Sequence, residues 1–194
     1  MDDSQATRES LLIRLEDERD GQAWSDFVDL YSPVIYGFAR RHGLQDADAA
    51  DLVQEVLRSV ARSILKYDRR KGRFRDWLMT VVRRRLSEHW ADRQRRTTGS
   101  GDSRVQEKLE RVASDAGTER LWEQEYQQSA FRFAVARIRD GFEESTWQAF
   151  WQTTVEGKTT RQVAQSLEMS EGAVYIARSR VISRLKLEIR ALEE

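Results

Sequence analysis

The sequence predicts an all-α fold made of two small helical domains joined by a flexible linker. One proline and ten glycines among 194 residues leave few helix breakers, so long helices are expected. Apolar residues recur at the three- and four-residue spacing of a helix face, and no useful stretch alternates as a strand would. Only 39% of the residues are hydrophobic, which favours small helical units over one large core.

The N-terminal domain is expected to span residues 1–96. Ser32 followed by Pro33 predicts the start of a helix, and Gly43 predicts its end. A further helix is expected from about residue 74 to residue 93. Between them lies an apolar stripe at helical spacing, consisting of Val53, Val56, Leu57, Val60, Ala61 and Ile64.

A polar segment, residues 97–118, is predicted to be a linker. It carries glycine and serine and lacks aromatic residues. A surface loop within one domain is the alternative, but structureless loops longer than about 15 residues are uncommon inside compact domains. Residues 119–194 then form the C-terminal domain.

The C-terminal domain is predicted to contain a helix-turn-helix. Thr159 and Gln162 form a capping box at the start of one helix, Glu168 lies in the turn, and Ser170 caps a second helix. A helical hairpin without a DNA role is the alternative. The residues expected on or beside the outer face of the second helix, where DNA would bind, are Tyr175, Ile176, Arg178, Ser179, Arg180 and Arg184.

The net charge of zero conceals a strongly basic segment. Residues 62–96 hold thirteen basic and four acidic side chains, a distribution that favours a polyanionic partner. Aromatic residues are interleaved with these charges, which suits stacked bases. A solvated helix face is the alternative, and the interleaving favours nucleic acid.

A short acidic motif, residues 51–55, precedes the basic segment. Its helical spacing directs Val53 to the core and leaves Asp51 and Glu55 on an outer face, with Gln54 beside them. Such a patch taken alone is most simply a solvated helix face. Its position directly before the basic segment makes a binding role the preferred interpretation.

Nothing in the sequence indicates catalysis, a metal or a cofactor. The chain has no cysteine, only two histidines that are far apart, and no complete Walker-type Gly-x-x-x-x-Gly-Lys-Ser/Thr motif, because Gln152 stands where Gly157-Lys158-Thr159 would need the first glycine. A nucleic-acid enzyme would need clustered carboxylates or a phosphate-binding loop, so this alternative is disfavoured. The polar N-terminus and the absence of a long apolar run lead us to expect a cytoplasmic protein.

Together these motifs resemble the extracytoplasmic-function (ECF) group of bacterial RNA polymerase sigma factors. The resemblance covers nearly the whole chain and rests on the order of four separate motifs. It implies that core RNA polymerase contacts Asp51, Gln54 and Glu55, and that residues 119–194 bind the promoter −35 element. It also implies a segment for the −10 element, with candidate residues Arg73, Phe74, Trp77, Arg83, Arg84 and Arg85.

The sequence differs from the family pattern in one segment, and one class of partner is not identified by it. Arg84 and Glu88 stand where the family often has Asn and Asp. Core polymerase and promoter DNA are the expected partners, and an anti-sigma factor is a further class that the sequence does not identify. A helix-turn-helix regulator with a ligand-sensing N-terminal domain is the alternative function, and it predicts an apolar pocket in residues 1–96.

Overall fold

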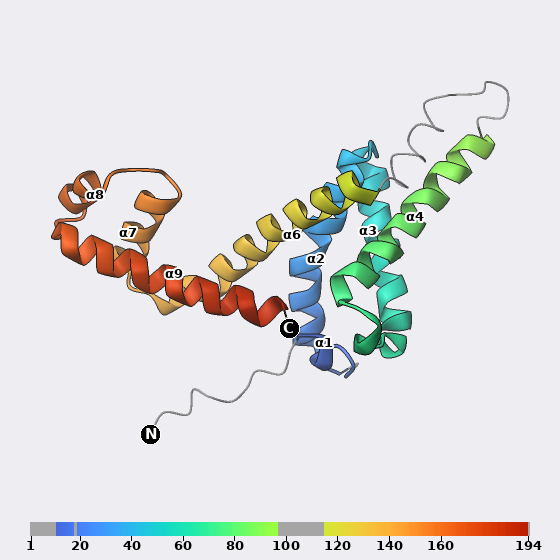
Figure 1. The fold of residues 1–194 in the computed structure, drawn as a ribbon, viewed down its shortest axis with the longest axis horizontal. Helices are drawn as coiled ribbons and strands as arrows, with labels where there is room; N and C mark the ends of the chain where they lie inside the picture. Colours follow the sequence, from blue (N-terminus) through green and yellow to red (C-terminus); the bar gives the residue numbers. More distant parts are fainter. Residues whose placement is uncertain (1–10, 18, 97–114, 194) are drawn as a thin grey trace. The chain divides into compact units, whose positions relative to one another are not determined.

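The computed structural model describes residues 11–17, 19–96 and 115–193, and all regular structure in these ranges is helical, as predicted. Three short 3-10 turns, η1 (Ile64–Lys66), η2 (Arg69–Lys71) and η3 (Arg139–Gly141), connect longer elements. The α-helices are α1 (Leu11–Arg14), α2 (Gly21–Arg41), α3 (Asp46–Ser63), α4 (Phe74–Arg96), α6 (Asp115–Ile138), α7 (Glu144–Thr154), α8 (Thr160–Ser166) and α9 (Glu171–Glu193) (Figure 1).

The chain divides into two compact units, and the division falls between Ser129 and Ala130, inside α6. The sequence placed it earlier, with a linker at residues 97–118 and a new domain from residue 119. Residues 97–114 of that linker lie outside the described residues, and residues 115–118 form the start of α6. Residues 119–129 therefore pack with the first unit rather than with the second.

Side chains on the first half of α6 explain this division. The Trp122 ring meets the Phe38 ring of α2 edge-on, with centroids 5.4 Å apart. Tyr126 is also buried, and the Ser129 hydroxyl donates a hydrogen bond of 2.6 Å to the carbonyl oxygen of Leu30. Burial of large aromatic side chains is among the strongest stabilising contributions in a small core, and it attaches this half-helix to α2.

Helix α2 is continuous, whereas the sequence predicted a helix start at Ser32 and Pro33. Pro33 lies inside the helix and lacks the backbone N–H that would bond to the carbonyl four residues earlier. An interior proline costs about 3 kcal/mol, but each neighbouring apolar side chain contributes about 1.5–3 kcal/mol when fully buried. Leu30, Val34 and Ile35 are all fully buried around it, so packing outweighs the missing hydrogen bond.

The core of the first unit lies between α2, α3 and α4. Each helix contributes buried residues three or four positions apart, as an amphipathic helix should. The largest contributions come from Phe27, Leu30, Val34, Ile35 and Phe38 of α2, Val56 and Val60 of α3, and Leu78, Val82, Leu86 and Trp90 of α4.

The second unit has a core of its own. One cluster joins the end of α6 to α7 and α9 through Ala134, Ile138, Trp147, Phe150, Val181 and Leu185. A smaller cluster holds α8 against α7 and α9, and it consists of Ala149, Val163, Ala164, Val174 and Ala177. Small residues dominate this second cluster, which lets the three helices approach closely.

Candidate functional site

The acidic motif lies on α3 with its polar side chains in solvent. Asp51, Gln54 and Glu55 are exposed, while Leu52 and Val53 between them are buried. Because side chains four positions apart share a helix face, the Asp51 and Glu55 carboxylates stand one turn apart. Within the described part of the chain, neither carboxylate has an ion-pair or hydrogen-bond partner.

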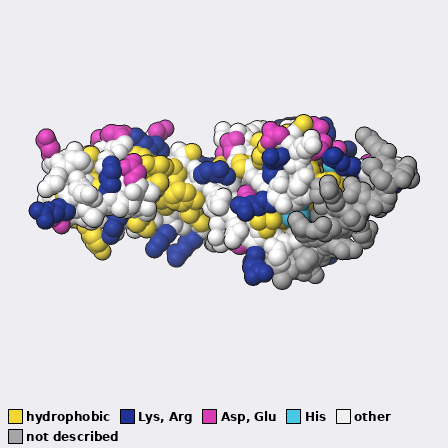
Figure 2. Space-filling view, turned by 90° about the horizontal axis from the view of Figure 1, so that it is seen from above, with side chains coloured by type: hydrophobic (Ala, Val, Ile, Leu, Met, Phe, Trp, Pro, Cys, Tyr) yellow, Lys and Arg dark blue, Asp and Glu magenta, His cyan; other side chains and the backbone are white. Residues whose placement is uncertain are grey.

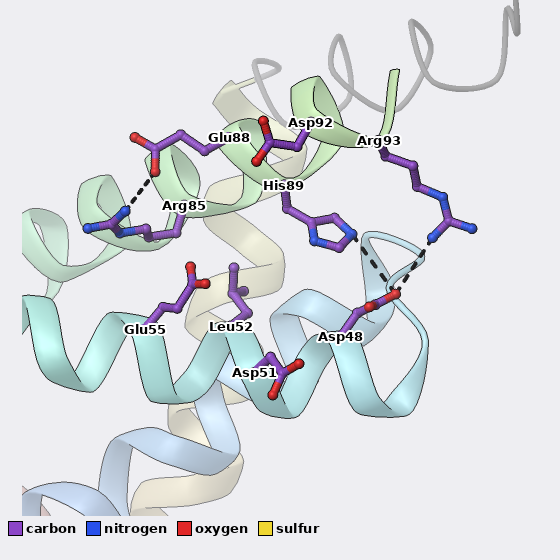
Figure 3. Close-up of a pocket in the computed structure, with 9 residues that line it drawn as sticks. All are labelled: Asp48, Asp51, Leu52, Glu55, Arg85, Glu88, His89, Asp92 and Arg93. Carbon is purple, nitrogen blue, oxygen red and sulfur yellow. Dashed lines mark hydrogen bonds and ion pairs between the residues drawn. The ribbon is translucent and has the colours of Figure 1, made fainter. Parts of the chain in front are cut away.

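These two carboxylates line a cleft between α3 and α4, which we call the acidic cleft. Figure 3 shows α3 and α4 facing each other across it. Its lining residues are Asp48, Asp51, Leu52, Glu55, Arg85, Glu88, His89, Asp92 and Arg93. All of them except Leu52 are polar or charged, so this cleft does not resemble the apolar ligand pocket that a sensory domain would need.

Most of the remaining charges in the acidic cleft are paired within the protein. Arg84 and Arg85 each donate to the Glu88 carboxylate, at 2.9 and 2.8 Å, and the hydrogen bond from Arg84 is the main reason that the pKa of Glu88 lies below its ordinary value. Arg93 approaches the Asp48 carboxylate at 3.6 Å. Asp51 and Glu55 are therefore the charges best placed to meet a separate basic partner.

On the α4 side of the acidic cleft only Arg85 was predicted as a binding residue. Glu88 and His89 lie three and four residues after Arg85, and Asp92 lies four and three residues after them, which places all four on one face of the helix. That spacing is visible in the sequence. What the sequence does not show is that this face lies opposite α3.

A basic groove also lies on α3 and α4. Its lining combines Ser59, Arg62, Ser63, Lys66, Val81, Arg84 and Arg85. Arg62 and Lys66 are exposed on the α3 side, one turn apart, and Arg84 faces them from α4. Clustered cations of this kind are suited to phosphate groups. The sequence indicated the arginines of α4 but not their convergence with Arg62 and Lys66.

The sequence predicted that Phe74 stacks on bases, but Phe74 lies in the core, so this prediction is wrong. Its ring is 5% exposed and contacts the Phe27, Tyr31 and Tyr67 rings, with centroids 5.4–6.0 Å apart. A ring enclosed by other rings has no free face for a base. Trp77 packs beside Phe74 at 5.3 Å but is only partly buried.

The predicted arginines of the basic segment occupy different surroundings. Arg73 is exposed and pairs with Asp76 at 3.2 Å. Arg85 is partly buried, and its guanidinium donates to the Ser59 hydroxyl of α3 at 3.0 Å. Arg84 is exposed, and Arg83 is partly buried. The structure thus brings Arg84 and Arg85 together at the basic groove, while Arg73 directly precedes the first residue of α4.

Helices α8 and α9 are joined by the turn that the sequence indicates. The capping box is present, with the Gln162 backbone N–H bonded to the Thr159 hydroxyl and the Gln162 side chain accepting from the Thr159 N–H. Glu168 adopts a left-handed conformation with φ of 54°, which reverses the chain. The Ser170 hydroxyl then accepts from the Ala173 N–H at 3.1 Å, as an N-cap does.

The outer face of α9 exposes the residues predicted to contact DNA. Tyr175, Ile176, Ser179, Arg180 and Arg184 are all exposed, and the buried Val174, Ala177 and Val181 alternate with them. Arg178 is partly buried and its guanidinium lies 5.2 Å from the centroid of the Tyr175 ring. Figure 2 shows hydrophobic and basic side chains next to each other on the surface of the second unit.

Two further apolar residues accompany these basic ones. Leu187 is exposed further along α9, and the partly buried Phe142 precedes α7. They complete a shallow groove with Tyr175, Ile176, Ser179, Arg180, Ser183 and Arg184. Phe142 and Leu187 were not predicted as site residues, because their contribution depends on how α7 and α9 pack.

Two comparisons with known proteins bear on the family. The sigma-70 region 2 family matches residues 27–96, from Phe27 in α2 to the last residue of α4. The ECF RNA polymerase sigma factor BldN of Streptomyces coelicolor is 24% identical over 184 residues, which covers 94% of this chain. Residues 27–96 thus form a sigma-70 region 2 domain, and the chain as a whole is similar to an ECF RNA polymerase sigma factor. It spans 66% of the length of this curated relative.

The match to sigma-70 region 2 includes both of the surfaces described on the first unit. The acidic cleft and the basic groove are formed entirely by α3, α4 and the turn after α3, all of which lie within residues 27–96. No helix among the described residues is long and apolar enough to cross a membrane. The described residues also hold no group of three or more His, Cys, Asp or Glu side chains that could bind a metal ion.

Proposed function

We propose that this chain binds core RNA polymerase and directs it to specific promoters for the initiation of transcription. The proposal places it in the cytoplasm, with core polymerase and promoter DNA as partners and with no catalytic role of its own. The observation that carries it is the exposed acidic face of α3 within a sigma-70 region 2 domain. An anti-sigma partner stays an expectation from the family resemblance.

Polymerase contact is assigned to Asp51, Gln54 and Glu55. The two carboxylates are exposed and unpaired among the described residues, so they are available to a basic surface on core polymerase. Charged contacts of this kind set encounter rate and register, and removing one partner of a desolvated pair at an interface costs about 2–5 kcal/mol. Glu55→Lys should therefore abolish co-purification with core polymerase while preserving the helical circular dichroism of the chain.

Glu119→Lys is the matched control for this experiment. Glu119 is exposed on α6 and makes no ion pair among the described residues, so the same charge change should leave polymerase binding intact. Normal binding by Glu55→Lys would show that the acidic face does not dock on polymerase. Equal loss in both variants would mean that net charge, rather than this surface, controls binding.

Binding of the −10 region is assigned to the basic groove and to α4. The DNA-binding residues would be Arg73, Trp77, Arg83, Arg84 and Arg85, with Arg62 and Lys66 of the groove added by the structure. Arginine and lysine neutralise phosphates, so removing one such cation should lower the salt dependence of binding by about one counterion. Permanganate footprinting of the open complex should show a weakened bubble for Arg84→Ala and an unchanged one for Glu119→Lys.

Binding of the −35 element is assigned to α8 and α9 acting as a helix-turn-helix. Arg180 is exposed on the outer face of α9, where it could bond two acceptors of guanine, worth about 1–3 kcal/mol of discrimination. Arg184, one turn later, would touch phosphate. Arg180→Ala should relax preference at one base pair of a selected promoter, whereas Arg184→Ala should weaken all sequences alike. An unchanged motif with Arg180→Ala would remove this assignment.

A further inference from the structure

The first half of α9 exposes the apolar side chain of Ile176, and electrostatic attraction to DNA gives no reason for an apolar residue there. Ile176 is 53% exposed, although its neighbours along the helix, Val174 and Ala177, are buried. Arg180 stands one turn after it on the same face. Protein surfaces that bind DNA are usually polar and positively charged, so an isoleucine among arginines needs a specific partner.

The major groove offers one apolar group, the C5-methyl of thymine. We propose that Ile176 reads a thymine of the −35 element through this methyl group. The arginines around Ile176, namely Arg178, Arg180 and Arg184, supply the charge complementarity that holds a DNA duplex against this face. The inference rests on the proposed binding of the −35 element by α9, and it adds the chemistry by which one base is chosen.

Ile176 suits this role better than the other exposed apolar residues of α9. The Arg178 guanidinium lies over the Tyr175 ring, 5.2 Å from its centroid, so one face of that ring is already occupied. Leu187 is 58% exposed, but it follows Ile176 by 11 residues, which is about 16 Å along a helix. Side chains that reach base edges come from the N-terminal part of such a helix, which contains Ile176 and not Leu187.

The test removes the methyl group from the DNA and leaves every hydrogen-bonding atom in place. The full chain bound to core RNA polymerase selects its preferred duplexes from a randomised library. Each thymine of the selected −35 motif is then replaced by uracil, one position at a time, and the dissociation constant is measured. One replacement should weaken binding about fourfold, the ratio that corresponds to the burial of one methyl-sized group.

A pair of variants assigns this effect to its residue. With Ile176→Ser, thymine and uracil at the sensitive position should bind almost equally. With Leu187→Ser, which removes an equally exposed apolar side chain from the same helix, the fourfold difference should persist. Both substitutions are at exposed positions, and an unchanged circular dichroism spectrum and unfolding midpoint would confirm that the fold is retained.

The outcomes separate this inference from the proposed function. A selected motif in which no uracil replacement weakens binding would overturn the role of Ile176 and leave −35 recognition standing. The same conclusion follows if the difference survives in Ile176→Ser or disappears in Leu187→Ser. Selection that returns no −35 motif at all would overturn both the inference and the proposed binding of DNA by α9.

Discussion

Gly37 of α2 lies directly beside the carboxyl group of Glu125 from α6. A Cβ atom placed on Gly37 would stand 2.7 Å from Glu125 Cδ and nearer still to Oε2. The Glu125 side chain is 8% exposed and forms an ion pair of 2.6 Å with Arg41. The missing side chain at position 37 thus makes room for the buried Glu125 carboxylate, whose ion pair with the exposed Arg41 attaches the first half of α6 to α2.

Gly37→Ala should weaken this attachment. In an ordinary helix interior the substitution would stabilise by about 1 kcal/mol through helix propensity. Here the new methyl displaces the Glu125 carboxylate from Arg41, and a buried charge deprived of its partner is costly. We expect a lower unfolding midpoint for Gly37→Ala and faster amide exchange in residues 115–129.

Two further variants make this prediction specific. Gly117→Ala, also in a helix, has nothing near its new methyl and should not lower the midpoint. In a Glu125→Ala background the obstacle is absent, so Gly37→Ala should become neutral or stabilising. A destabilisation by Gly37→Ala that is the same with and without Glu125 would refute the proposed conflict between the two side chains.

Phe74→Ala should destabilise the first unit and not only weaken its binding of DNA. The ring is buried among four other rings, and removal of a core phenylalanine typically costs about 3–5 kcal/mol. Chemical denaturation should show this loss directly. Leu65→Ala is a suitable control because Leu65 is 66% exposed, and its free energy of unfolding should change by less than about 0.5 kcal/mol. A fully stable Phe74→Ala variant would contradict the packing described for this ring.

The pairing of Glu88 with Arg84 and Arg85 predicts a pH dependence of stability. The hydrogen bond from Arg84 lowers the pKa of Glu88 below its ordinary value of 4.5. A carboxyl group with a lowered pKa contributes stability that is present above its ordinary pKa and is lost as the pH falls through the lowered value. The unfolding midpoint of wild type should therefore exceed that of Glu88→Gln at pH 7, and the two should converge in acid.

Glu55→Gln provides the comparison for this titration. The Glu55 carboxylate has no partner among the described residues, so its variant should follow the wild-type profile throughout. A constant difference between wild type and Glu88→Gln from pH 7 to pH 3 would mean that the substitution acts through packing instead of charge.

The capping box at the start of α8 predicts that removing the Thr159 hydroxyl lowers the stability of this helix in the second unit. Helix α8 has only seven residues, so removing one cap takes away a large share of its end interactions. Thr159→Ala should cost about 1 kcal/mol and speed amide exchange in α8, while Thr159→Ser keeps the hydroxyl and should behave as wild type. Equal exchange rates in all three proteins would show that tertiary packing alone holds α8.

Several parts of the structure could be predicted from the sequence because they depend on local patterns. The apolar spacing of α3 correctly predicted Val53, Val56, Val60 and Ile64 as buried, although Leu57 is only partly buried and Ala61 is exposed. Thr159 with Gln162 predicted the start of α8. Other features depend on which surfaces meet. Trp122 falls within residues 119–194, the range assigned from the sequence to the C-terminal domain, but periodicity alone does not say that its side chain packs in the core around α2.

Phe74 illustrates the same limit within the candidate site. An aromatic residue among arginines fits a stacking role, yet Phe74 also precedes the buried Leu78 and Val82 at four-residue spacing, which is the signal of a core position. The acidic cleft required the pairing of α3 with α4, which no single helix encodes. The exposed residues of α3 and α9, by contrast, follow directly from helical spacing, and the structure places them in solvent as predicted.

Transcription in vitro tests the central claim most directly. Core RNA polymerase is incubated with genomic fragments, with or without the purified chain, and the start points of the transcripts are mapped. We predict discrete start points that require the chain, that share upstream sequence motifs, and that disappear with Glu55→Lys but not with Glu119→Lys. Transcripts identical to those of core polymerase alone would contradict the assignment of this protein as a promoter-directing sigma factor.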